Sequence, residues 1–293
     1  MPIDGPCPPE VLASVGDLEL VARIVVEGLV SGLHRSPFHG YSAEFSQYRR
    51  YRPGDDLKYV DWKLLARTDR VFTKQFRETT NMAASIVVDT SASMDFPPAA
   101  IAKPTKFRYG VIVAAALAHV ISGQGDAVGL VAGNDVLPPR GGRQHLRRLL
   151  ASLGSLTPGG AWPGPGIVRR AADRLSRHGL LIVVSDFYDE EERMAAELRR
   201  AQRMGHEVVL FQVLTRDEIE LPYNRDLELA DLESGARLAV NTALARRDYR
   251  DAVAEFLERM RSRALAEGFQ YTLAVTNTPP ARALRGFLLS RQP

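Results

Sequence analysis

Two short runs of apolar, mostly β-branched residues constrain the fold of this chain more than any other feature. Residues 86–88 are Ile-Val-Val and lead directly into Asp89. Residues 180–184 are Leu-Leu-Ile-Val-Val and lead into Ser185 and Asp186. Apolar runs of this length, bounded by turn-forming residues, are typical of strands buried on both faces of a parallel sheet. Further strand-like segments alternate with helical ones, which predicts an α/β fold with a doubly wound, mostly parallel sheet flanked by helices.

The helical segments differ in how much apolar surface they carry. Residues 106–121, which Thr105 can cap, are apolar on nearly every side, and a helix of this kind is normally enclosed by other elements. Residues 12–30 carry apolar residues at helical spacing and predict one or two helices at the N-terminus. The main domain is therefore expected to bury one helix completely.

The loops that follow the two apolar strands carry oxygen-bearing side chains. Asp89 is followed by Ser91 and Ser93, and the second strand ends at Asp186. An isolated Asp-x-Ser-x-Ser would be explained equally well as an ordinary turn with capping hydroxyls. Two aspartates at the carboxyl ends of strands in one sheet favour a cation site, because ligands of open α/β sheets bind at that edge. Carboxylates and hydroxyls suit Mg²⁺, so we predict a metal site made of Asp89, Ser91, Ser93 and Asp186.

Length and composition indicate a globular protein. The 293 residues, 45% hydrophobic and 25% charged, suffice for one large α/β domain with an extension. No apolar stretch approaches the roughly 20 residues of a membrane span, and the N-terminus lacks the features of a signal peptide. Cys7 is the only cysteine, as is common in a reducing compartment. We expect a cytoplasmic protein without a membrane span.

The N-terminal extension has a character of its own. From residue 36 to residue 81, aromatic and charged residues alternate around a strong turn signal, Pro-Gly-Asp-Asp at residues 53–56. We assign residues 1–80 to a helical and β-rich extension and residues 81–293 to the main domain. The aromatics are too few for a separate core and too many to leave exposed, so we expect the extension to pack on the main domain.

Several motifs resemble known families. The Asp-x-Ser-x-Ser at residues 89–93, a Gly-Gly loop at residues 159–160 and the Val-Ser-Asp at residues 184–186 resemble the metal-ion-dependent adhesion site of von Willebrand factor A domains. The run Tyr-Arg-Pro-Gly-Asp-Asp-Leu-Lys-Tyr-Val-Asp-Trp-Lys-Leu-Leu-Ala-Arg at residues 51–67 and the Asp-Leu-Glu-Ser-Gly at residues 231–235 resemble the bacterial domain-of-unknown-function 58 family. The resemblance extends from about residue 31 to the C-terminus.

The resemblance implies a fold and a kind of function. Members of the family have a von Willebrand A-like domain and are usually encoded beside MoxR-type AAA+ ATPases. They are thought to serve these ATPases as adaptors in the assembly or maturation of other proteins, and no catalytic activity is established for them. The resemblance therefore implies a non-enzymatic protein-interaction module with Mg²⁺ at the adhesion site and a MoxR-type AAA+ ATPase as partner.

The chain departs from the adhesion-site pattern at one position. The usual pattern takes a threonine from a Gly-Gly-Thr loop, whereas this loop reads Pro-Gly-Gly-Ala and ends at Ala161. Ala161 offers no side-chain oxygen, and Thr157 lies four residues earlier. We expect weak or partial occupancy by Mg²⁺.

The alternative is a divalent-metal-dependent hydrolase or phosphatase that uses Asp89 and Asp186. Aspartyl phosphotransfer enzymes of the haloacid-dehalogenase type place a second aspartate two residues after the first, where this chain has Ser91. A nucleophilic Ser91 would need a histidine base, and none of the six histidines lies in a motif that would supply it. No phosphate-binding Gly-x-x-x-x-Gly-Lys-Ser/Thr loop occurs. These absences favour the interaction module.

Nucleic acid is not expected as a partner. The net charge is only +3, and the basic clusters near Tyr48 and in residues 143–148 are explained equally well as solvated faces.

Overall fold

The computed structural model describes residues 7–30, 43–52, 55, 60–78, 82–96, 104–162, 164–176, 178–188, 191–233 and 235–289. The chain divides into two compact units. Unit 1 comprises Met1–Pro37 and Met82–Pro293, and unit 2 comprises Phe38–Asn81.

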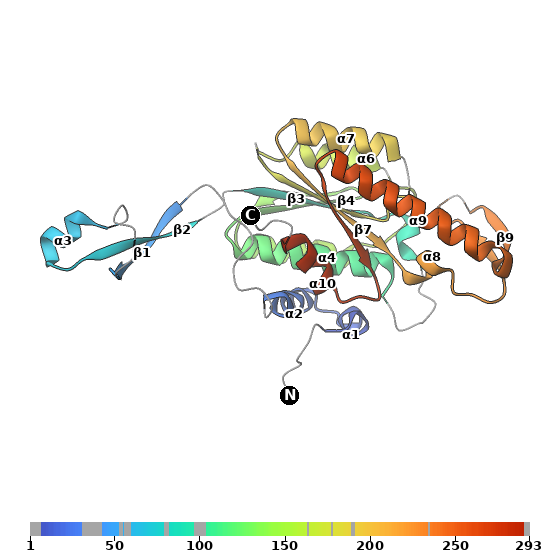
Figure 1. Ribbon diagram of the computed structural model, residues 1–293, viewed down its shortest axis with the longest axis horizontal. Coiled ribbons are helices and arrows are strands. Elements are labelled where there is room, and N and C mark those ends of the chain that lie inside the picture. The colour runs from blue at the N-terminus through green and yellow to red at the C-terminus, as the bar shows by residue number, and fades with distance from the viewer. Residues whose placement is uncertain are drawn as a thin grey trace. The chain divides into compact units, whose positions relative to one another are not determined.

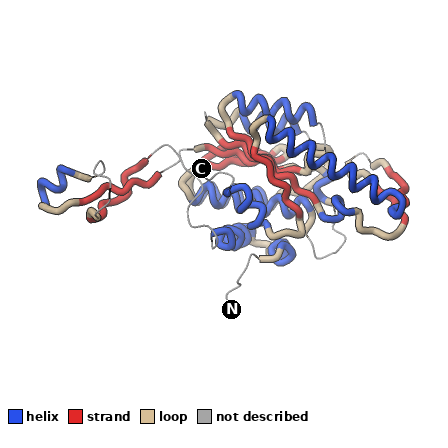
Figure 2. Tube along the Cα trace, viewed as in Figure 1, coloured by secondary structure: helices blue, strands red, loops and turns tan. Residues whose placement is uncertain are grey.

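A six-stranded sheet forms the centre of unit 1 (Figures 1 and 2). Its strands lie in the order β10-β7-β6-β3-β4-β5. Their bounds in that order are Gln270–Val275, Glu207–Leu214, Leu180–Ser185, Ala83–Val88, Ala127–Ala132 and Asp135–Arg140. All neighbours pair in parallel except β4 and β5, which form an antiparallel hairpin at one edge.

This topology is doubly wound. Numbered along the chain from β3, the strand order from the β5 edge is 3-2-1-4-5-6, the order of the Rossmann-type sheet. The order reverses between β3 and β6, the two apolar strands from which the fold was predicted. The predicted fold class, an α/β fold with a doubly wound, mostly parallel sheet flanked by helices, is confirmed.

Helices cover both faces of the sheet (Figure 1). On one face lie α6 (Gly164–Ala172), α7 (Glu191–Arg203) and α9 (Thr242–Ala266). On the other face lie α4 (Lys106–Gly123) and α10 (Pro280–Leu289), with α5 (Arg143–Ser155) against α4. A short 3-10 turn, η2 (Ala92–Asp95), follows β3, and α8 (Arg216–Glu220) follows β7. A hairpin of β8 (Asp226–Ala230) and β9 (Arg237–Asn241) precedes α9.

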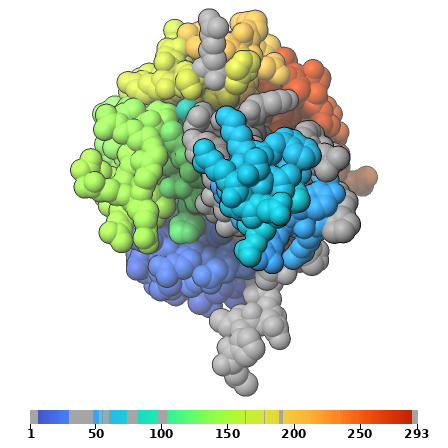
Figure 3. Space-filling view, turned by 90° about the vertical axis from the view of Figure 1, so that its left-hand side faces the viewer, coloured from blue at the N-terminus to red at the C-terminus, as the bar shows by residue number. Residues whose placement is uncertain are grey.

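The N-terminal helices form an outer layer over α4. α1 (Pro9–Ser14) and α2 (Leu18–Val30) both contact α4, and α2 also contacts α5 and α10. In the space-filling view, α2 in blue lies next to α5 in green (Figure 3). Because α2 covers it, α4 is buried on nearly every side, as its apolar sequence predicts.

Unit 2 is a hairpin with a short helix in its connection. β1 (Ala43–Arg50) pairs with β2 (Phe72–Glu78), and α3 (Trp62–Thr68) precedes β2. Asp61 caps α3 by accepting hydrogen bonds from the backbone N–H groups of Lys63 and Leu64, both at 3.0 Å. Trp62, the first residue of α3, is 61% exposed. The packing of this segment on the main domain stays a prediction.

The Pro-Gly-Asp-Asp motif contributes a structural link within unit 2. Asp55 accepts a hydrogen bond from Arg49 of β1 at 2.7 Å and another from Thr73 of β2 at 3.2 Å. A hydrogen bond from the Arg52 backbone, and then the bonds from Arg49 and Thr73, hold the pKa of Asp55 below its ordinary value. The described part of this motif therefore ties the two strands together; Pro53, Gly54 and Asp56 lie outside the described residues.

No helix within the described residues is both long enough and apolar enough to cross a membrane.

Candidate functional site

The carboxyl ends of β3 and β6 bring the predicted site residues together. The two strands pair in parallel with Val88 opposite Val184, so the residues that follow them emerge at the same edge of the sheet. The backbone N–H of Asp89 donates to the carbonyl of Val184 at 2.9 Å, which extends the pairing by one step. Asp89 and Asp186 thus flank the point where the strand order reverses, which is where doubly wound sheets bind ligands.

Asp89 is buried and holds both loops in place. Its Oδ2 accepts a hydrogen bond from the Ser185 hydroxyl at 2.6 Å, and its Oδ1 accepts one from the backbone N–H of Ser91 at 2.8 Å. Burial, and then the negative charge of Asp186, raise the pKa of Asp89 to about 7, although these hydrogen bonds act in the opposite direction. A cation nearby would favour the ionised form of this carboxyl.

A row of oxygen atoms connects the two strand ends. The hydroxyls of Ser91 and Ser93 are 2.8 Å apart, and the Ser93 hydroxyl donates to Asp186 Oδ2 at 3.0 Å. Ser91 is buried and Ser93 is half-buried, so Ser93 is the member of the row that solvent reaches. The structure brings all four predicted site residues together.

The Gly-Gly loop lies against this row, as the adhesion-site resemblance implies. The backbone N–H of Gly159 donates to the carbonyl of Thr90, and that of Ala92 donates to the carbonyl of Gly160, both at 2.8 Å. Ala161 follows directly and is exposed.

A buried lysine that sequence reasoning missed completes the site. Lys106, the first residue of α4, is 1% exposed, and its Nζ lies 2.8 Å from Asp186 Oδ2 and 2.6 Å from Glu218 Oε1. Burial alone would lower the pKa of Lys106, but the two carboxylates outweigh it and raise the pKa above its ordinary value. Lys106 is therefore a fixed positive charge within the site. One feature of the sequence indicates this contact. Lys106 begins a helix that is apolar on nearly every side, and a buried ammonium needs a carboxylate partner.

Glu218 is positioned by the first turn of α8. Thr215 caps this helix in a capping box, in which its hydroxyl accepts from the backbone N–H of Glu218 and the Glu218 carboxylate accepts from the Thr215 backbone. The Tyr249 hydroxyl of α9 donates to the Glu218 carbonyl at 2.6 Å. Glu218 lies 112 residues after Lys106, and no local pattern links the two.

A hydrogen bond to its backbone carbonyl holds Asp186 in place. Gln212, fully buried on β7, donates to the Asp186 carbonyl at 2.8 Å and accepts from the Tyr271 hydroxyl at 2.6 Å. Phe187, which follows Asp186 in the chain, has a φ of 58°, in the left-handed region that bulky residues seldom adopt. Strain of this kind clusters at functional sites, where the surrounding contacts hold it.

The oxygen atoms at this site fit Mg²⁺ in type and spacing. Neighbouring ligands of an octahedral Mg²⁺, with bonds of 2.0–2.1 Å, are about 2.9 Å apart. The Ser93 hydroxyl has that spacing from both the Ser91 hydroxyl and Asp186 Oδ2, and the same distances suit ordinary hydrogen bonds. Among the described residues, no group of three or more His, Cys, Asp and Glu side chains could hold a metal ion. A divalent cation here would depend on the serine hydroxyls, and it would share Asp186 with Lys106.

The histidines make their described contacts elsewhere. His145 Nε2 lies 2.8 Å from the Val128 carbonyl, and His206 Nδ1 accepts from the Gly179 backbone at 3.3 Å. His34 and His39 lie outside the described residues. The structure therefore supplies Ser91 with no histidine base in the part of the chain that it describes.

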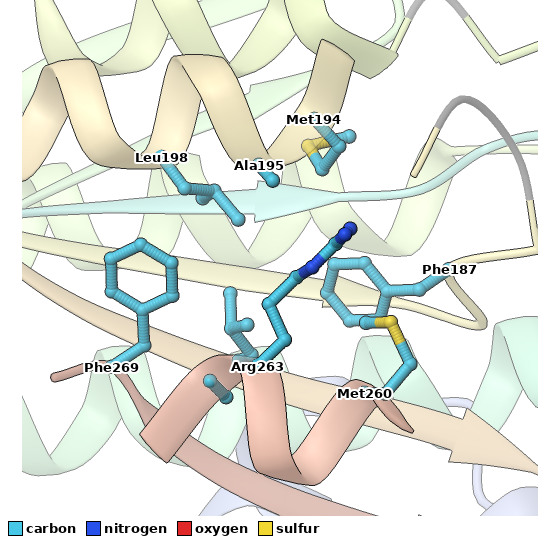
Figure 4. Close-up of a pocket in the computed structure, with 9 residues that line it drawn as sticks. Phe187, Met194, Ala195, Leu198, Met260, Arg263 and Phe269 are labelled. Atoms are coloured by element: carbon cyan, nitrogen blue, oxygen red, sulfur yellow. The ribbon is translucent and has the colours of Figure 1, made fainter. Parts of the chain in front are cut away.

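A small apolar cavity lies behind the site, between α7, α9 and the sheet (Figure 4). Its volume of about 20 Å³ is close to the room that one water molecule needs. It is lined by side chains that include Phe187, Met194, Leu198, Met260 and Phe269. A cavity of this size has room for about one water molecule and is too small for a substrate.

A family model, sequence relatives and solved structures match this chain. A family model described as "Protein of unknown function DUF58" matches residues 47–259. The uncharacterized protein Rv1480 of Mycobacterium tuberculosis is 32% identical over 234 residues, which cover 78% of this chain and 72% of the relative. The uncharacterized protein YeaD of Bacillus subtilis is 27% identical over 122 residues, 40% of this chain and 28% of YeaD. Among solved structures, the conserved hypothetical protein BatB of Bacteroides thetaiotaomicron has a TM-score of 0.47 and 14% identity, over 72% of this chain and 98% of BatB.

Proposed function

Because this chain belongs to the DUF58 family, we propose that it is a non-enzymatic protein-interaction module and an adaptor for a MoxR-type AAA+ ATPase in the assembly or maturation of other proteins. The partner would bind at the carboxyl edge of the sheet, over Ser93 and the residues around it. The adaptor role comes from the family resemblance.

One observation supports the carboxyl edge of the sheet as the partner-binding surface. A buried charged cluster lies at the point of strand reversal, and it reaches solvent through the half-buried Ser93 and through Tyr188, a residue that is 43% exposed. Tyr188 stacks on Phe256 of α9, with ring centroids 5.4 Å apart, so the ring is held in place before any partner binds. An exposed, fixed tyrosine beside polar groups is typical of an interface anchor.

We also propose that Mg²⁺ can bind here, held by Ser91, Ser93 and Asp186. The ion would supply a positive charge to which an acidic side chain of the partner could bind. Asp89 would hold the two loops in register through Ser185 and the Ser91 backbone.

Capture of a purified MoxR-type ATPase by the immobilised protein tests the surface. We expect Tyr188→Ala and Ser93→Ala each to weaken capture about tenfold, the effect of losing about 1.4 kcal/mol at an interface. Because Tyr188 also covers the Lys106 ammonium and Ser93 donates to Asp186, capture is compared at a temperature at which circular dichroism shows every variant to be folded. Arg148→Ala on α5, an exposed position on the α4 side of the sheet, is the matched control. Undiminished capture by both site variants would refute this surface, and loss with Arg148→Ala would move the interface to α5.

A phosphatase screen with Mg²⁺ and Mn²⁺ separates the module from the hydrolase alternative. We expect no turnover. Turnover that Asp89→Ala abolishes would support the hydrolase instead.

A further inference from the structure

The site contains a cation of its own. The ammonium of Lys106 is buried between Asp186 and Glu218, at 2.8 and 2.6 Å. The ring of Tyr188 covers it, with Nζ 5.1 Å from the ring centroid, and Phe96 lies at 5.9 Å. Two carboxylates and two aromatic rings around one ammonium are the surroundings that a buried cation needs.

Asp186 Oδ2 is the atom on which two demands meet. It accepts hydrogen bonds from both the Lys106 ammonium and the Ser93 hydroxyl. A divalent ion coordinated by Ser91, Ser93 and Asp186 would need the same carboxylate, and it would lie close to the ammonium. The two cations would repel each other across a poorly screened, buried space.

We propose that Lys106 is the resident cation of this site, that it neutralises Asp186 and Glu218 without metal, and that it keeps the affinity for Mg²⁺ low. The proposal uses the same site as the proposed function, but it concerns cation binding rather than partner binding. The Lys106 charge would be a second cause of weak Mg²⁺ binding. The first is that Ala161 has no side-chain oxygen.

Lys106→Met tests the proposal, because methionine keeps the length and apolar stem of the side chain and removes the charge. We expect isothermal titration calorimetry to show Mg²⁺ binding at least about tenfold tighter than in the wild type, since the unpaired carboxylates gain a counter-ion. In EDTA the variant should unfold at a lower temperature than the wild type, and Mg²⁺ should restore part of the loss by binding the folded state. Lys106→Arg keeps the charge and is the matched control; its Mg²⁺ affinity should stay as low as that of the wild type.

A second variant guards against loss of folding. Lys106→Met/Glu218→Gln leaves only one of the two carboxylates without its partner, so it should fold more readily while still binding Mg²⁺ more tightly than the wild type. Equal Mg²⁺ affinity in the wild type and in the folded variants would overturn the proposal. So would tight Mg²⁺ binding by the wild type itself. Neither result depends on whether the ATPase binds, so failure here and failure of the proposed function are distinguishable.

Discussion

At the scale of single residues, Ala161 offers the simplest change to the site. The neighbouring Gly160 already lies against the loop that carries Ser91, through the hydrogen bond from the Ala92 backbone. We expect Ala161→Thr to raise Mg²⁺ affinity, because it restores the oxygen that the adhesion-site pattern takes from this position. Calorimetry on Ala161→Thr and wild type checks this, with Ala161→Val as a control of the same shape without the hydroxyl. If Ala161→Thr has no effect in either the wild type or the Lys106→Met background, the loop follows a different path and Thr157 becomes the next ligand to test.

A buried histidine predicts how stability depends on pH. His206 Nδ1 accepts a hydrogen bond from the Gly179 backbone, so this nitrogen must be unprotonated in the folded state. Burial, and then the positive charge of His178, lower the pKa of His206 below its ordinary value. Between the unfolded pKa of about 6.5 and the lower folded value, the unfolded chain binds more protons, so the free energy of unfolding decreases as the pH falls. We expect urea unfolding to show this loss below about pH 6.5, and His206→Gln to reduce its slope. An unchanged slope in the variant would assign the loss to other groups.

At the scale of elements, α2 is the layer that lets α4 be enclosed. Val25, on the buried side of α2, is only 2% exposed, whereas Leu20 on the same helix is 40% exposed. We expect Val25→Asp to destabilise the protein by about 3 kcal/mol or more, because it places a carboxylate in an apolar contact. Leu20→Asp is the matched control and should cost less than about 1 kcal/mol. Urea unfolding measures both, and similar losses in the two variants would mean that α2 does not pack on α4 in solution.

The elements themselves were predictable wherever a local pattern determined them. The strands of residues 86–88 and 180–184 are apolar on both faces, which is typical of the centre of a parallel sheet, and their paired ends place Asp89 beside Asp186. The cation of the site was not predictable in the same way. Lys106 meets Glu218 only because α4 and α8 begin near the same edge of the sheet, and this depends on the complete topology. The sequence thus predicted which oxygen-bearing side chains come together and missed the charge that balances them.

At the scale of the whole molecule, the two units differ in how much buried core each contains. The core of unit 1 is built from its own strands and helices, with α1 and α2 supplied from before unit 2 in the chain. Unit 2 has few buried side chains among its described residues, and Trp62 and Tyr48 are exposed. A cut at residue 81 therefore removes an essential layer of unit 1 together with unit 2.

Two shortened chains separate these contributions. We expect residues 82–293 alone to lose cooperative unfolding and to bind a hydrophobic dye, because the outer side of α4 is exposed once α2 is absent. A chain in which a flexible linker joins Pro37 to Met82, without unit 2, should retain a single cooperative thermal transition, because it keeps every layer around α4. Circular dichroism melts and dye binding on both chains measure the difference. If the linker-joined chain also becomes molten, unit 1 depends on contacts with unit 2, as the aromatic content of residues 36–81 predicts; if residues 82–293 fold cooperatively alone, the layer formed by α1 and α2 is dispensable.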